Sequence, residues 1–185
     1  AASKRINELK RKNVESPQGL IAQSFLADIY LFQKEYEKFE ECLQTADSGV
    51  TQLGFNELIK HRKDRMLGTV CEIKNDYDDA INHYEAALHE SPDWHTWEGV
   101  PKLSSIGRCY RKLKKYNKSE EHLLAVINKD PFHPEIHYEL GRLYHDTKKT
   151  KKAEDHIKIS IDIWKDADSE YGKSNKAKEI YKAWK

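Results

Sequence analysis

The chain has 185 residues, of which 38% are hydrophobic and 34% are charged, and this apolar share is enough for a folded core. With 32 basic and 31 acidic residues the net charge is +1, which singles out neither a nucleic acid nor an acidic membrane as partner. No apolar run reaches the length of a membrane span and three cysteines do not make a disulfide framework, so we expect a cytoplasmic protein.

Charge is divided unevenly along the chain. Residues 1–100 carry 12 basic and 18 acidic side chains, whereas residues 101–185 carry 20 and 13. At the N-terminal end, Ala2, Ile6 and Leu9 have helical spacing. We expect residues 1–19 to form a short helix or the remnant of a preceding repeat.

From residue 61 onward one pattern occurs three times, beginning at Gly68, Gly107 and Gly141. Each glycine follows a Leu or Ile, and a small residue and then a larger apolar residue stand 12 and 16 positions later. The apolar positions recur at helical spacing on both sides of a polar break, so each unit is predicted to be a pair of helices. A more divergent unit with Ala27 in the place of the glycine precedes them. The four predicted repeats span residues 20–53, 61–92, 100–131 and 134–164.

The recurring glycines predict close contact between the two helices of each unit. A glycine inside a helix costs roughly 1 kcal/mol relative to alanine, so three at the same position need a compensating reason. We expect the small residues Ala80, Ser119 and Ala153 to keep the second helix close. The larger residues that should fill the next layer are Tyr84, Leu123 and Ile157.

These units resemble the tetratricopeptide repeat family, which has a Leu-Gly, a Tyr three residues later, an Ala, an aromatic residue and a closing Pro. The resemblance spans residues 20–164 and departs from the family where an early Trp is absent, at Asp64, Leu103 and His137. It implies an all-α fold, a right-handed superhelical solenoid of antiparallel helix hairpins with about four repeats. Residues 165–185 follow, and their apolar stripe on a Lys-rich helix predicts a C-terminal capping helix.

The sequence predicts no catalytic site, no cofactor and no metal site. Cys71 replaces a packing tyrosine of the repeat, and we expect structural roles for Cys42 and Cys109 too. Histidines recur at one position of the second helix, but on separate hairpins, whereas metal ligands must converge on one ion. They are His83, His122 and His156. We therefore expect a protein that is not an enzyme.

In the family that this chain resembles, the first helix of each repeat lines a concave groove that holds peptides. Carried over by position, the resemblance implies a groove for an acidic peptide or protein, formed by Arg62, Arg65, Arg108, Arg111, Tyr138 and Arg142. Forked guanidinium donors suit carboxylates. The alternative is that Glu135, Glu139 and Asp146 of the chain itself pair with these arginines.

The predicted function is that of a protein-interaction scaffold, and the chain would suit the repeat region of a larger regulator. One alternative is an RNA-binding repeat protein, because lysines at the turns of the third and fourth units should merge into one ridge. These lysines include Lys114, Lys115, Lys148 and Lys149. Another alternative is self-association through Trp94 and Trp97, which the repeat pattern does not require. The oligomeric state stays open.

Overall fold

The structure, a computed structural model, describes residues 16–54, 59–90, 99–128, 130–166 and 172–184. Within these ranges the secondary structure is helical throughout, which confirms the predicted all-α class. The elements are α2 (Pro17–Gln33), α3 (Tyr36–Gln52), α4 (Lys60–Ile73), α5 (Tyr77–Glu90), α6 (Gly99–Lys112), α7 (Tyr116–Ile127), α8 (Pro134–Asp146), α9 (Thr150–Ile163), η2 (Trp164–Asp166) and α10 (Gly172–Ala183). None of these described helices is both long and apolar enough to cross a membrane.

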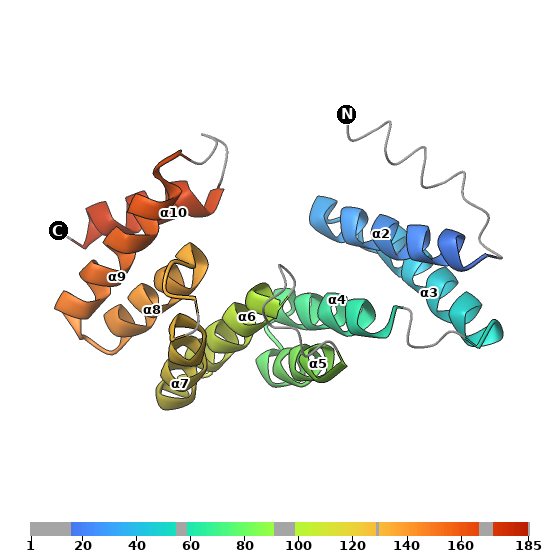
Figure 1. Ribbon diagram of the computed structural model, residues 1–185, viewed down its shortest axis with the longest axis horizontal. Coiled ribbons are helices and arrows are strands. Elements are labelled where there is room, and N and C mark those ends of the chain that lie inside the picture. Colours follow the sequence, from blue (N-terminus) through green and yellow to red (C-terminus); the bar gives the residue numbers. More distant parts are fainter. Residues whose placement is uncertain (1–15, 55–58, 91–98, 129, 167–171, 185) are drawn as a thin grey trace.

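Successive helices form hairpins that stack into a curved solenoid. The pairs are α2 with α3, α4 with α5, α6 with α7 and α8 with α9. Figure 1 shows α4, α6 and α8 along the inner side of the arc and α5, α7 and α9 along its outer side. Helix α2 begins at Pro17, after the N-cap Ser16 accepts a hydrogen bond from the Gly19 N–H at 3.1 Å. Residues 17–19 therefore belong to the first hairpin, while residues 1–15 lie outside the described part.

Each of the last three hairpins is closed where a glycine of its first helix meets a large side chain of its second. A Cβ atom added to Gly68 would lie 2.8 Å from the ring of Tyr84, far inside van der Waals contact. At Gly107 and Gly141 it would lie 2.5 Å from the nearest atom of Leu123 and of Ile157. The large residues are those that the sequence predicts to fill this layer, so the predicted reason for the glycines is confirmed.

The four hairpin turns share one backbone conformation. One residue in each turn has a left-handed φ: Lys34 (62°) directly after α2, and Asn75 (65°), Lys114 (59°) and Lys148 (59°) two residues after α4, α6 and α8 end. The next N–H bonds back to the carbonyl five residues earlier, as in Lys115 N to Tyr110 O at 2.9 Å and Lys149 N to Tyr144 O at 2.8 Å. Asparagine tolerates this φ better than lysine does. The turns are thus structurally equivalent although their sequences differ.

The first hairpin joins the rest of the solenoid differently from the others. Helix α5 packs along α6 and α7 along α8, whereas α4 contacts the first hairpin chiefly through α2. The junction is sealed by Met66 and Ile59, both fully buried against α2 and α3. It is also bridged by an ion pair of 2.8 Å between Lys63 Nζ and Asp47 Oδ1.

Helix α10 stands where the first helix of a further hairpin would lie. Near its start Lys173 pairs with Glu135 of α8, and near its end the Trp184 ring stacks on His145 at 4.2 Å. Because the starts of α8 and α10 contact each other and so do their ends, α10 runs parallel to α8. Ala177 is fully buried, whereas the outward face is polar, as the end of a repeat stack requires. Its exposed residues include Asn175, Lys176, Lys178, Glu179 and Lys182.

Candidate partner-binding surface

The first helices of successive hairpins form one continuous surface, which we call the first-helix face and define as α2, α4, α6 and α8. Ion pairs cross from each of these helices to the next: Asp28 of α2 binds Arg62 of α4, and Glu72 of α4 binds Arg108 of α6. Arg111 of α6 in turn binds Asp146 of α8. The first helices of successive hairpins are therefore linked to one another, and α4, α6 and α8 run along the inner side of the arc (Figure 1).

Arg62 and Arg65 share a single carboxylate. Arg62 Nη1 lies 2.7 Å from Asp28 Oδ2, and Arg65 Nη2 donates to Asp28 Oδ1. The guanidinium of Arg62 also lies over the Phe25 ring, 4.1 Å from its centre. Both arginines of α4 are therefore tied to the same residue of α2.

Arg108 is held within the protein. Its Nε and Nη2 atoms bind the two oxygens of Glu72, the latter at 2.8 Å, and Nη1 lies 3.4 Å from Glu139 Oε1. Burial by itself lowers the pKa of Arg108, but the Glu72 hydrogen bonds and the charge of Glu139 outweigh it and raise that pKa. Arg108 therefore remains charged and joins three hairpins.

Arg111 is buried, with 5% of its side chain exposed, and donates from Nη1 to Asp146 Oδ2 at 2.8 Å. Its Nη2 atom lies 3.7 Å from Glu139 Oε2. Pairing within the chain, the alternative that the sequence left open, is thus what the structure shows for Arg108 and Arg111. Glu72 and Asp28, the partners of Arg108 and Arg62, were not predicted from the sequence.

Tyr138 and Arg142 are arranged as a stacked pair. The Tyr138 ring is 5% exposed, lies 6.0 Å from the Trp164 ring and carries the Arg142 guanidinium 5.6 Å above its centre. Tyr138, predicted as a groove residue, is therefore buried and supports Arg142. Within the described ranges, Arg142 is the one predicted arginine that forms no ion pair with a carboxylate. Trp94 and Trp97 lie outside the described residues.

The predicted lysine ridge runs across the last two hairpin turns. Lys115 reaches back to Asp78 at 2.8 Å and Lys149 to Glu120 at 3.3 Å, so each turn lies beside the preceding hairpin. Lys149 also lies over the Tyr144 ring, which is 2% exposed. The ring is covered by lysine and so offers no open face on which a nucleic-acid base could stack.

Two of the three cysteines, Cys42 and Cys109, are buried, His137 is buried and His156 is half-buried. Burial raises the pKa of the buried Cys109 thiol to about 12, which keeps it protonated near neutral pH. The Nδ1 atoms of His137 and His156 lie 2.8 Å apart, and His137 Nε2 lies 2.9 Å from the Pro131 carbonyl. Burial lowers the pKa of His156 to about 4. Across the described ranges no group of three or more His, Cys, Asp or Glu residues is placed to hold a metal ion.

Comparison with known proteins agrees with this geometry. The family model described as "Tetratricopeptide repeat" matches residues 106–168. The structure also superposes on the tetratricopeptide-like repeats of a putative kinesin light chain from Podosopora anserina, with a TM-score of 0.60, 17% identity, and coverage of 86% of this chain and 82% of that one. Residues 106–168 therefore belong to the tetratricopeptide repeat family, and the described chain has the fold of a tetratricopeptide-like solenoid.

Two further matches cover only part of a larger protein, and a third covers most of its protein. BBSome complex member BBS4 from Bos taurus is 30% identical over 105 residues, which are 55% of this chain and 17% of that protein. In the APC/C hetero-tetramer Cut9–Hcn1, the matched chain gives a TM-score of 0.68 at 20% identity, over 89% of this chain and 29% of its own length. YrrB, a TPR protein with an unusual peptide-binding site, gives a TM-score of 0.59 at 17% identity, over 94% of this chain and 85% of its own. The chain thus spans less than a third of the first two.

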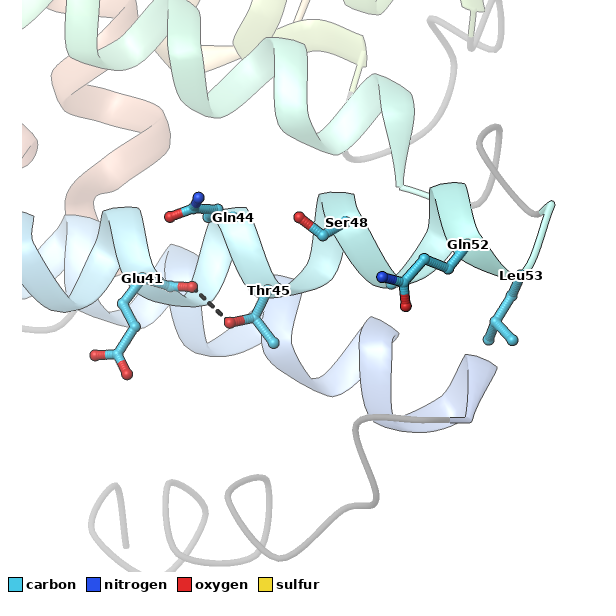
Figure 2. A pocket seen from close by; sticks show the side chains of 7 residues that line it. Glu41, Gln44, Thr45, Ser48, Gln52 and Leu53 are labelled. Carbon is cyan, nitrogen blue, oxygen red and sulfur yellow. Dashed lines mark hydrogen bonds between the residues drawn. The ribbon is translucent and has the colours of Figure 1, made fainter.

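An open hollow lies on a second helix of the tetratricopeptide stack, away from the first-helix face. Figure 2 shows its lining side chains along α3, where Thr45 donates a hydrogen bond of 2.8 Å to the Glu41 carbonyl. The other lining residues are Gln44, Ser48, Gly49, Gln52 and Leu53. The described lining comes from a single helix, and none of the predicted site residues takes part in it.

Proposed function

We propose that this tetratricopeptide repeat chain binds an acidic peptide segment of a protein partner on its first-helix face. The family supports a role as a protein-interaction scaffold, and the acidic character of the partner is the further step. The observation that carries this step is Arg142, whose guanidinium rests on the Tyr138 ring without a carboxylate among the described residues. A guanidinium held over an aromatic ring keeps its forked donors available to a carboxylate.

The other predicted arginines support the surface in a different way. A partner carboxylate that displaced Glu72 from Arg108 would leave a largely buried anion unpaired, which is costly. We therefore assign Arg62, Arg65, Arg108 and Arg111 to holding neighbouring hairpins in place. Arg142 is the residue that meets the partner directly.

The test compares Arg142→Glu with the charge-matched control Lys176→Glu on the outward face of α10. Each purified protein is titrated into a fluorescein-labelled peptide of ten glutamates at low and at moderate salt. We expect the wild type and Lys176→Glu to bind, with weaker binding as salt rises, and Arg142→Glu to lose at least ten-fold in affinity.

Helical circular dichroism of the three proteins must be the same for the comparison to hold. Equal peptide affinity of Arg142→Glu and the wild type would contradict the proposal, as would the absence of binding by the wild type. Affinity capture from the source cell with the same variants then identifies the partner, which should be retained by Lys176→Glu and lost by Arg142→Glu.

A further inference from the structure

Three apolar side chains are exposed on the first helices of the first two hairpins. They are Phe25 and Phe32 of α2, which are 41% and 89% exposed, and Ile73 of α4, which is 49% exposed. Phe25 and Phe32 are seven residues apart and so project from the same side of α2, roughly 10 Å apart along its axis. Phe32 and Ile73 occupy equivalent places, each five residues after the small residue of its repeat. We call these three residues the apolar ledge.

The ledge is not a requirement of the repeat fold. The places equivalent to Phe32 and Ile73 in the next two hairpins hold Lys112 and Asp146. An exposed phenylalanine gains little for folding, because most of its surface stays in water. A cluster of such residues on one face is typical of a surface that another molecule covers.

Positive charge borders the ledge. Arg62 lies against the Phe25 ring, and Arg62 and Arg65 both bind Asp28. Lys34 and Lys74 follow Phe32 and Ile73 at the ends of α2 and α4. Both lysines are exposed, and neither forms an ion pair with a carboxylate within the described residues.

We propose that the apolar ledge docks a segment of a partner protein in which bulky apolar side chains are flanked by acidic residues. The apolar side chains cover Phe25, Phe32 and Ile73, and the flanking carboxylates face the surrounding cations. A second copy of this chain is a poor occupant, because two ledges brought together would place like charges opposite each other. The site is separate from Arg142 and does not depend on the acidic peptide proposed to bind there.

The test uses a display library of random 12-residue peptides, selected on the full chain. We expect the enriched peptides to combine large apolar residues with a net negative charge. For the best of them, Phe32→Ser and Ile73→Ser should each weaken binding at least ten-fold. The matched control is Leu53→Ser at the end of α3, where an apolar side chain of similar exposure, 41%, lies away from the ledge.

The control variant should bind these peptides as tightly as the wild type, and so should Arg142→Glu, which separates this proposal from the preceding one. A charge reversal, Lys34→Glu with Lys74→Glu, should weaken binding while leaving the helical circular dichroism unchanged. Enrichment of basic or purely polar peptides, no enrichment, or equal binding by Phe32→Ser and Ile73→Ser would overturn the proposal. So would concentration-dependent dimerisation that Phe32→Ser abolishes, or peptide binding that appears only after residues 1–15 are deleted.

Discussion

The two halves of the first-helix face, α2 with α4 and α6 with α8, have the same helical arrangement but different side-chain environments. Between α6 and α8, Arg108 and Arg111 are enclosed by carboxylates from neighbouring hairpins, and little of them reaches solvent. Between α2 and α4, two arginines share one carboxylate and exposed apolar residues stand beside them. The backbone determines which positions of neighbouring helices lie side by side. The residue types at those positions determine whether the side chains pair within the chain or stay exposed to a partner.

The largest difference between the halves should appear when one arginine of each is removed. Arg108→Ala leaves Glu72 without its cation and removes one of the two arginines beside Glu139, and these carboxylate side chains are only 18% and 3% exposed. We expect this variant to lose about 2–3 kcal/mol of unfolding free energy. Arg65→Ala should lose less than about 1 kcal/mol, because Asp28 keeps Arg62 as its partner.

Urea unfolding of both variants, followed by circular dichroism at 222 nm, measures the two losses. Raising the salt concentration should shrink the loss in Arg65→Ala more than that in Arg108→Ala, because the latter pair is less accessible. Equal losses in the two variants would mean that the halves do not differ as described.

Substitutions at the glycines test what the two halves have in common, which is the close contact between the two helices of a hairpin. Gly141→Leu would drive a side chain into Ile157, and Gly68→Leu would drive one into Tyr84. Both should lose roughly 1–3 kcal/mol through overpacking, with a lower melting temperature in each case. Gly172→Leu is a control, since no atom lies within 4 Å of a Cβ added at Gly172. An unchanged melting temperature in Gly141→Leu would show that this hairpin can separate its helices freely.

The contacts within hairpins and the ion pairs between hairpins differ in how well the sequence predicts them. The hairpin contacts were predictable because each links residues 16 apart within one unit, and the small residue and its large partner recur together. The ion pair of Glu72 with Arg108 joins residues 36 apart on different hairpins. Its offset depends on the connector between hairpins, and the connectors of this chain have unequal lengths. The carboxylate partner of Arg108 could therefore not be chosen from spacing alone.

The apolar ledge was missed for a different reason. Sequence reasoning sought charged groove residues at fixed positions and did not consider the place five residues after the small residue. Phe32 and Ile73 stand there, and both look like core residues by type. An aromatic or aliphatic residue at this register, with charged residues at the same place in other repeats, is the signal that was available.

Acidification should affect the second half through His156. Its pKa is lowered to about 4 in the folded chain, whereas an unfolded histidine titrates near 6.5. The unfolded state therefore binds more protons between these values, so the free energy of unfolding should fall as pH decreases from about 6.5 to about 4. Because the imidazole is partly exposed, we expect His156 to account for a loss on the order of 1 kcal/mol.

Urea unfolding at several pH values in this window, compared between the wild type and His156→Gln, measures the contribution. The variant should lose less stability than the wild type on acidification, because glutamine cannot take up the proton. Identical pH dependence of the two proteins would contradict the assignment.

The smallest effect concerns the hairpin turns, which are equivalent in geometry but not in residue type. Lys114 has a φ of 59°, a conformation that disfavours a Cβ atom, while Asn75 occupies the same place in the preceding turn at lower cost. Lys114→Gly should relieve this strain, and the greater freedom of glycine in the unfolded chain should offset part of the gain. We expect a net stabilisation of about 0.5 kcal/mol and a melting temperature higher by roughly 1–3 °C. Asn75→Gly should change stability less, and a clear destabilisation by Lys114→Gly would show that the lysine side chain itself supports the turn.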